Sequence, residues 1–597
     1  MVSDNFNVKK YSLTPAIGQA ILNFNNRLSA NELYMQVYDS QKEELYNPDN
    51  KEELDGYVFD GDCLSVCAKL RDDGKLVDLV YIDPPFASNA DYVKKIYLRN
   101  QKEKENIIAD NSIGEEIMYN DIWSKEDYLN WLYVRLLAIK EVMSENASIF
   151  VHLDWHIAQY VKVLLDEVFG EANFVNEIIW SYRSGGASKE GSLPKKHDNI
   201  FLYRKGEKNI INNKIERQYL ERPFMDSKID DEGRYYVDTI LRDVLEGAPT
   251  IVHDDGSLEE YNMRPVLNLS KERVDYSTQK PEGLLKMLIE IASNEGQVVA
   301  DFFGGSGVTA NVAYKTNRKF ITCDIGKNSI QTIRDRLINS NAAFEIIDIK
   351  DGIDLDRNPV ETVNKLFYLF EGAKRNLESD YSDLWDGEIP YRNEMTLTKI
   401  IDNKRMLDEE YLDYLITNIN IEHSNDNRNK YLITYIYKGA NIDQKMVNKK
   451  LLDEGVDYKV YIEPIENLLK MKKNKIIQKN SAVVSINRVG TKYRVKIEKF
   501  FSPYLKNKVD EFNNKIKDKS KKISYDENGY QLIESIQFDT TMEEEWRSRK
   551  DLEVKIGKKD PATNGEFILD TDTFYMKIRD IVGEEIIINS KEMQFNG

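Results

Sequence analysis

Four consecutive residues, Asp83-Pro84-Pro85-Phe86, follow directly on an apolar run over 77–82 whose pattern predicts a buried strand. The two prolines fix the backbone and carry no N–H, which leaves carbonyl oxygens free to accept hydrogen bonds. A carboxylate and a carbonyl presented together can accept both N–H groups of an aromatic amine and make its nitrogen more nucleophilic. Phe86 adds an apolar face for stacking. Taken alone, the tetrapeptide would more often be a turn that ends a strand.

A second candidate site lies where a predicted strand over 298–301 runs into the glycine-rich turn 303–307 and then into a helix. Glycines let a backbone approach a ligand closely, and the amides of the turn can cradle polar groups. The spacing matches neither Gly-x-Gly-x-x-Gly nor the nucleotide-triphosphate loop. Asp324 ends the next predicted strand, where a carboxylate can accept hydrogen bonds from both hydroxyls of a ribose. The combination favours a site for a nucleoside cofactor.

Both motifs require strands that end at a common edge. Apolar runs predict strands at 57–60, 77–82, 147–153, 178–182, 200–203, 298–301 and 319–324, and helical spacing predicts helices at 128–143, 157–169, 281–292 and after Gly307. This alternation is the signature of a parallel α/β sheet, in which ligands bind at the carboxyl ends of the strands. The regular spacing is lost between 205 and 275, so we expect one domain interrupted by an insertion.

The bulk composition limits the classes of protein. A chain of 597 residues is too long for one compact core, so several domains are expected. No apolar run is long enough to span a bilayer, and the first residues do not resemble a secretory signal. Three cysteines and five histidines without paired spacing predict no metal site and fit a reducing cytoplasm.

The charge is unevenly distributed. A net charge of −19 would by itself disfavour nucleic acid as a partner, because phosphate contacts supply much of the affinity for DNA. Residues 470–522, however, hold 17 Lys and Arg against 4 Asp and Glu, a local balance of +13 that leaves −32 for the rest. Two interpretations remain open, a solvated Lys-rich surface and a DNA-facing stripe.

The two motifs, in this order, resemble the amino-methylating DNA methyltransferases of the permuted β group. Further segments match the same family at 57–70, 148–155, 195–203 and 276–282. The resemblance covers about 57–337 and is nearest to the modification subunits of type III restriction-modification systems and their stand-alone relatives. It implies a Rossmann-like, seven-stranded domain of the α/β class that binds S-adenosyl-L-methionine.

The activity that the resemblance implies is methyl transfer to the N6 amino group of adenine in double-stranded DNA, after the base is flipped out of the duplex. Asp83 is typical of adenine-modifying members, whereas cytosine-N4 enzymes favour Ser there. Cytosine-C5 chemistry needs a cysteine after a proline, and none of the three cysteines follows one. A cytosine-N4 enzyme, or a catalytically idle DNA-recognition subunit for a partner nuclease, remains the alternative.

The resemblance also assigns site residues. The catalytic residues would be Asp83, Pro84, Pro85 and Phe86, and the cofactor residues would be Asp62, Lys280, Asp301, Phe303, Gly305, Gly307 and Asp324. Lys280 would lie near the methionine carboxylate of the cofactor and Asp62 near its adenine. Relatives often have Cys or Ala at position 304, and the Gly found here is not expected to impair cofactor binding. For DNA contact we expect residues of a Gly- and Ser-containing loop that follows a predicted strand: Arg183, Lys195, Lys196 and His197.

Five regions follow from these interpretations. They are a helical extension at 1–50, the target-base half at 51–204, an inserted target-recognition region at 205–275, the cofactor half at 276–340, and an α+β C-terminal region at 341–597 for DNA contact or dimerisation. The expected partners are DNA, a second copy of the chain and a separate restriction subunit, in a bacterial cytoplasm. Glu553-Val554-Lys555 resembles a nuclease fragment, but such short matches are common in charged chains, so no nuclease is assigned.

Overall fold

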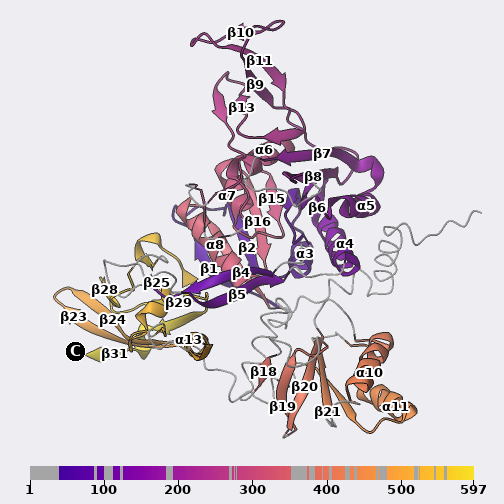
Figure 1. The fold of residues 1–597 in the computed structure, drawn as a ribbon. Coiled ribbons are helices and arrows are strands. Elements are labelled where there is room, and N and C mark those ends of the chain that lie inside the picture. Colours follow the sequence, from indigo (N-terminus) through magenta and orange to yellow (C-terminus); the bar gives the residue numbers. More distant parts are fainter. Residues whose placement is uncertain are drawn as a thin grey trace, which may run out of the picture.

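The computed structural model describes residues 39–596. The ranges outside the description are 87–90, 100–111, 121–124, 183–192, 268–269, 271, 275, 277, 351–372, 376–383, 393, 402–406, 424–429, 436–439, 465–467, 469–479, 516–521, 524, 543–545 and 557–560. The described chain is built around one large sheet with helices on both faces, from which a small sheet projects and beside which two C-terminal units lie (Figure 1).

The large sheet has 11 strands in the order β12-β7-β8-β6-β3-β15-β16-β2-β17-β1-β26. Seven adjoining strands are those that the sequence predicts: β7 (Phe174–Ser181), β8 (His197–Arg204), β6 (Met143–Asp154), β3 (Val77–Ile82), β15 (Val298–Asp301), β16 (Lys319–Asp324) and β2 (Gly56–Asp60). β15 and β16 lie between β3 and β2, so the chain after the insertion completes the sheet begun before it. The prediction of an interrupted Rossmann-like α/β domain is confirmed.

Among the seven predicted strands, the expectation of a wholly parallel sheet is wrong at one, β8. β8 returns between β6 and β7 and pairs antiparallel with both. A short apolar run shows that a strand is buried but carries no information on its direction. Four further strands widen the sheet: β12 (Val244–Glu246) at one edge and β17 (Phe344–Lys350), β1 (Asp39–Tyr46) and β26 (Trp546–Arg547) at the other.

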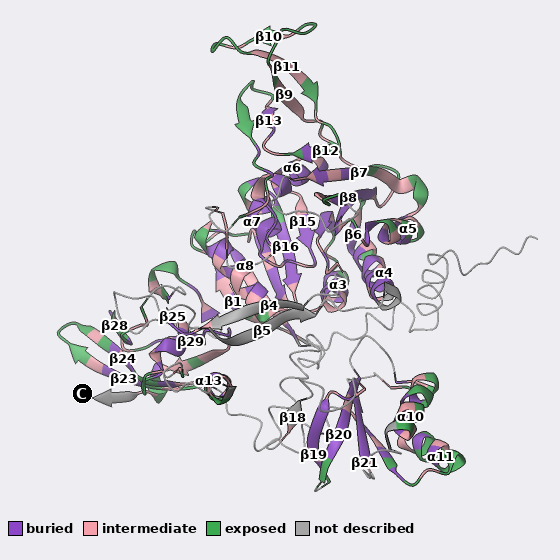
Figure 2. Cartoon of the chain, viewed as in Figure 1, coloured by how far each residue is buried: buried purple, intermediate pink, exposed green. Residues whose placement is uncertain are grey.

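Helices cover both faces of the sheet. On one face lie α3 (Cys63–Asp72), α4 (Lys125–Val142) and α5 (Ala158–Phe169), and on the other α6 (Glu282–Ala292), α7 (Val308–Lys315) and α8 (Lys327–Asn339). Along β3, Val80 and Ile82 enter the first core while Leu79 and Tyr81 enter the second. Central strands buried on both faces explain why their sequences are continuously apolar (Figure 2).

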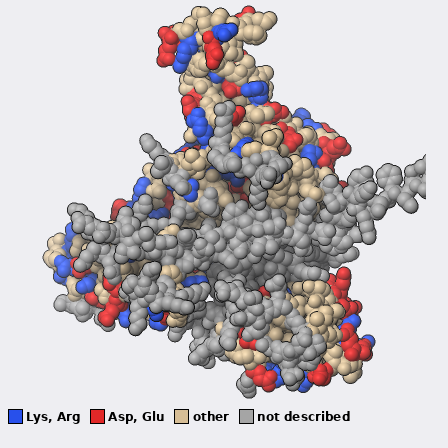
Figure 3. Space-filling model, in the orientation of Figure 1, with Lys and Arg blue, Asp and Glu red and all other residues tan. Residues whose placement is uncertain are grey.

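The inserted region contains a separate sheet that projects from the body near α6 and β7 (Figure 1). Its strands are β9 (Ile215–Leu220), β10 (Lys228–Ile229), β11 (Tyr235–Ile240), β13 (Thr250–Val252) and β14 (Leu258–Glu260). Residues 215–260 hold five Lys and Arg against thirteen Asp and Glu, a net charge of −8. On the face drawn in Figure 3, acidic and basic side chains are interspersed over this sheet rather than gathered in one basic patch.

The C-terminal region contains two units. The first has its own core and consists of β18 (Lys374–Arg375), β19 (Gly387–Tyr391), β20 (Glu394–Ile401), β21 (Lys430–Tyr435), β22 (Lys459–Pro464), α10 (Glu409–His423) and α11 (Gln444–Glu454). The second, with a shared core, consists of β23 (Ser481–Val489), β24 (Lys492–Phe501), α13 (Pro503–Lys515), β25 (Ile533–Asp539), β27 (Glu553–Lys555), β28 (Glu566–Leu569), β29 (Tyr575–Asp580), β30 (Glu585–Asn589) and β31 (Gln594–Asn596).

The structure differs from the expected regions at three places. Residues 39–46, expected to be helical, form β1, which pairs antiparallel with β17; residues 1–38 lie outside the description. β17 and β26 belong to the stretch 341–597 but join the large sheet, so this stretch is not wholly separate. The hairpin of β4 (Asp91–Tyr97) and β5 (Ser112–Asn120) was not anticipated. Each pairing joins segments that are polar or distant in sequence, which local patterns do not reveal.

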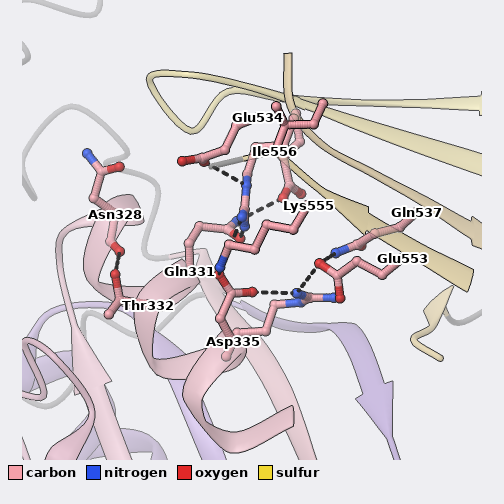
Figure 4. Close-up of polar contacts among 12 residues, drawn as sticks. Asn328, Gln331, Thr332, Asp335, Glu534, Gln537, Glu553, Lys555 and Ile556 are labelled. Carbon is pink, nitrogen blue, oxygen red and sulfur yellow. Dashed lines mark hydrogen bonds and ion pairs between the residues drawn. The ribbon is translucent and has the colours of Figure 1, made fainter. Parts of the chain in front are cut away.

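A buried ion-pair network joins the second C-terminal unit to α8 (Figure 4). Nε of Arg334 contacts both carboxylate oxygens of Glu44 at 3.0 and 2.9 Å, and Nη1 contacts Asp335 at 2.9 Å and Glu553 at 3.3 Å. Lys555 pairs with Asp335 as well. Glu553 and Lys555, the residues of the nuclease-like fragment, are therefore engaged in joining the two parts of the molecule.

Two features are absent from the part of the chain that the structure describes. Among the helices that the structure describes, none is long and apolar enough to cross a membrane. Within the same residues no group of three or more His, Cys, Asp or Glu could hold a metal ion.

Candidate active site

The predicted motifs meet at one edge of the large sheet. β3, β15, β16 and β2 are parallel neighbours, so their carboxyl ends lie side by side. The residues that follow them are Asp83 to Phe86, the loop Phe303 to Gly307, Asp324, and Asp62. Side chains from four chain segments are thereby brought to one site, as ligand sites of open α/β sheets require.

Only one of the two carboxylate oxygens of Asp83 has a hydrogen-bond partner among the described residues. Its Oδ2 accepts a hydrogen bond from Nζ of Lys280 at 2.5 Å, while its Oδ1 is buried and has no hydrogen-bond partner among the described residues. The ammonium of Lys280 also lies 5.2 Å from the centre of the Phe86 ring. A buried acceptor without a donor costs about 1–3 kcal/mol, so this oxygen is suited to a ligand N–H. The site thus offers one free acceptor, Oδ1 of Asp83, beside the aromatic ring of Phe86.

Lys280 is paired with Asp83: its ammonium forms an ion pair with the Asp83 carboxylate. The position expected for Lys280, near the methionine carboxylate of the cofactor, stays a prediction. The two residues are 197 positions apart in the chain, which is why no local pattern suggested the pair.

The glycine loop is shaped by Asp324. Gly305 and Gly307 have φ values of +49° and +73°, a region in which only glycine is unstrained. The backbone N–H of Gly305 donates to Oδ2 of Asp324 at 2.8 Å, and that of Gly326 donates to Oδ1 at 2.8 Å. Burial raises the pKa of the Asp324 carboxyl. Each oxygen retains lone-pair capacity, so this carboxylate can still accept from ligand hydroxyls.

The buried carboxylate of Asp301 accepts hydrogen bonds from the glycine loop and from α7. Its Oδ1 accepts from the backbone N–H of Phe303 at 3.0 Å and its Oδ2 accepts from Oγ1 of Thr309 at 2.6 Å. Burial raises the pKa of Asp301 to about 7. These hydrogen bonds stay within the loop and the first turn of α7, so Asp301 shapes the loop, while its contact with the cofactor stays a prediction.

Asp62 links the site to α4. It caps α3 by accepting from the Leu64 N–H at 2.9 Å, and its Oδ2 accepts from Arg135 at 2.6 Å. The Arg135 guanidinium lies 4.3 Å from the centre of the Trp131 ring, and that ring packs 5.6 Å from Phe303. Sequence reasoning missed both Trp131 and Arg135. The available signal was their i,i+4 spacing on one helix, which the apolar pattern of α4 concealed.

Three of the four residues proposed for DNA contact lie near this edge. Asp198 of β8 pairs with Asp154 at the end of β6, so Lys195, Lys196 and His197, which precede or begin β8, are at the same edge as Asp83. Nζ of Lys195 lies 3.7 Å from the ring centre of Trp155, which is 40% exposed. Arg183 falls outside the described residues. Trp155 is a further surface residue that the sequence did not single out.

Comparison with known proteins agrees with this geometry. A DNA methylase family model matches residues 77–335. Type II methyltransferase M.EcaI of Enterobacter cloacae is 25% identical, covering 45% of this chain and 66% of that protein. The StyLTI Mod subunit, a type III restriction-modification enzyme of Salmonella typhimurium, is 23% identical, covering 48% and 54%, and the DNA adenine methyltransferase YhdJ of Escherichia coli is 23% identical, covering 46% and 80%. The chain therefore spans less than two thirds of the first two relatives.

Among solved structures, the complex of M1.HpyAVI with SAM is 15% identical and covers 47% of this chain and 98% of that one. Its TM-score is 0.29, so the fold assignment rests on the strand order described above. The family match contains β3 with Asp83, the insertion, the glycine loop and the first part of α8, whereas Asp62 lies before it. Residues 77–335 are thus similar to the DNA methylase family.

Proposed function

We propose that this protein transfers a methyl group from S-adenosyl-L-methionine to the N6 amino group of adenine in double-stranded DNA. The observation that carries the proposal is the Asp83 carboxylate, with one oxygen held by Lys280 and the other buried without a donor. An amino group with two N–H bonds can donate to that oxygen and to the Pro84 carbonyl. The adenine assignment is also supported by the likeness to an adenine methyltransferase.

Each residue has a separate task in the proposed reaction. Asp83 and Pro84 accept hydrogen bonds from the target amino group, and Phe86 stacks against the flipped base. The cofactor residues are the glycine loop, Asp324 for the ribose hydroxyls, and Asp62 near the adenine. When bound, the cofactor supplies an electrophilic methyl group. Alignment of the amino nitrogen by this chain's residues accounts for most of the rate enhancement.

The wider assembly is also proposed. The likeness to a type III Mod subunit supports action together with a separate restriction subunit, in a bacterial cytoplasm. Sedimentation of the purified chain tests whether two copies pair. We assign target recognition to the insertion 205–275. For phosphate contact we favour the β23–β24 hairpin, because residues 481–501 carry five Lys and Arg and one Glu, with Arg488, Arg494 and Lys499 exposed.

The test is transfer of labelled methyl groups to DNA. We expect the wild-type protein to label DNA and to yield N6-methyladenine on hydrolysis, and we expect Asp83→Ala to reduce the rate by about 1,000-fold, as loss of an aligned polar group does. Asp72→Ala, at an exposed acid on α3, is the matched control. N4-methylcytosine in the hydrolysate would establish the cytosine alternative. DNA binding without any transfer would establish an idle recognition subunit.

A further inference from the structure

The ion pair between Lys280 and Asp83 is enclosed. The side chain of Lys280 is 9% exposed and that of Asp83 is 19% exposed. Removing one partner of a buried pair leaves the other charge uncompensated, which is strongly unfavourable. An ammonium has three donors and no acceptor, and here one donor is directed at Asp83.

The turn before Lys280 fixes its position. Gln279 is buried; its Oε1 accepts from the Val274 N–H at 2.8 Å and its Nε2 donates to the Glu272 carbonyl at 2.8 Å. On the other side, Pro281 caps α6, whose first residue is Glu282. Lys280 therefore projects from a backbone that is tied down on both sides, and its ammonium is directed by the fold rather than by a ligand.

A second buried carboxylate, that of Asp198, is influenced by the charge of Lys280. Asp198 accepts from Nε2 of His152 at 3.0 Å and from the Tyr182 hydroxyl at 3.0 Å. Burial alone would raise the pKa of Asp198, but its hydrogen bond with His152 and the charges of His152 and Lys280 lower it. The charge of Lys280 thus acts on Asp198, but among the described residues only Asp83 lies within ion-pair distance of Lys280.

The network returns to the strand that carries Asp83. Nδ1 of His152 is 2.8 Å from the hydroxyl of Tyr81, two residues before Asp83 on β3. The His152 ring is fully buried and meets the Trp180 ring edge-on at 5.6 Å. These contacts are those of a structural support beneath the site.

We propose that Lys280 is the positioning residue of the base site: it holds Oδ2 of Asp83 so that Oδ1 alone faces the target amino group. This inference rests on the proposed function, whose substrate it leaves unchanged. It assigns Lys280 to the base rather than to the methionine carboxylate of the cofactor. In this role, Lys280 contributes only through Asp83, and the turn at Gln279 and the Asp198 network keep it there.

The test separates cofactor binding from transfer. For Lys280→Met we expect the dissociation constant of labelled S-adenosylmethionine to change less than about twofold, while the single-turnover rate at saturating cofactor falls about 100-fold. In an Asp83→Asn background, Lys280→Met should cause no further loss, because the residue it positions is already altered. Lys280→Arg, which keeps the charge, should recover part of the rate. Lys286→Met on α6 is the matched control.

Two results would overturn the inference. One is a cofactor dissociation constant raised tenfold or more in Lys280→Met with an unchanged saturated rate, which would place the lysine on the cofactor. The other is an undiminished effect of Lys280→Met in the Asp83→Asn background. If the wild type transfers no methyl group, the proposed function fails. The positioning role is then still decided by fluorescence of 2-aminopurine at the target position, which Lys280→Met should lower and Lys286→Met should not.

Discussion

At the scale of single residues, the candidate site is built from carboxylates that the protein has already partly engaged. Asp83 is held by Lys280, Asp324 by two backbone N–H groups and Asp62 by Arg135. Of their oxygens, Oδ1 of Asp83 has no hydrogen-bond partner among the described residues. This arrangement orients the carboxylates before any ligand binds, which lowers the free energy needed to align substrate.

Asp301 gives a prediction in pH. Burial raises its pKa to about 7 in the folded protein, against about 3.9 when unfolded. Between these values the folded state binds one proton more than the unfolded state, so this residue makes stability fall as pH rises from about 4 to about 7, by up to ~1.4 kcal/mol per pH unit. Urea unfolding of wild type and Asp301→Asn at pH 5 and pH 8 should show a smaller fall in the variant. Equal falls would contradict the assignment.

At the scale of elements, the glycine loop is packed against the next strand. A Cβ atom on Gly304 would lie 2.4 Å from Oγ1 of Thr322 and 2.9 Å from Cδ1 of Ile333. β16 and α8 thus fill the space that a larger side chain at position 304 would need. The side chain of Thr322 on β16 leaves no room for a Cβ atom at position 304, which follows β15.

We therefore expect Gly304→Ala to weaken S-adenosylmethionine binding about tenfold, since relief of the clash must shift the loop or the strand. The Thr322 Oγ1 atom has no hydrogen-bond partner among the described residues, so removing it should cost little. The double variant with Thr322→Ala should recover most of the affinity, measured by equilibrium dialysis. An affinity that stays low in the double variant would refute the proposed steric cause.

At the scale of the whole molecule, the second C-terminal unit is joined to the large-sheet domain by buried ion pairs. Arg334 is 2% exposed, and its guanidinium lowers the pKa of Glu44 to about 2 against the opposing effect of burial. Arg579, from β29, pairs with Asp335 of α8 at 3.4 Å. α8 also carries Ile333, which packs beneath the glycine loop. The second C-terminal unit thus supports the helix that packs beneath the glycine loop.

Arg334→Met should lower the free energy of unfolding by about 3 kcal/mol, because it leaves buried carboxylates unpaired. Arg549→Met, which removes an exposed pair with Asp551, should cost less than about 0.5 kcal/mol. The stabilisation from Glu44 is present above pH 4 and is lost as the pH falls towards 2. The free energies of unfolding of Arg334→Met and of wild type should therefore converge in acid. Equal losses in urea unfolding at pH 7 would show that the network adds no stability.

The sequence by itself determined the seven central strands, their order around an insertion and the two motifs at one edge, because buried strands and glycine turns have local signatures. Tertiary structure alone decided which side chains meet. Lys280 reaches Asp83 across 197 residues, Arg135 reaches Asp62 from another helix, and Arg334 joins Glu44 to Glu553. Polar partners carry no periodic pattern, and their pairing depends on where the fold brings distant segments together.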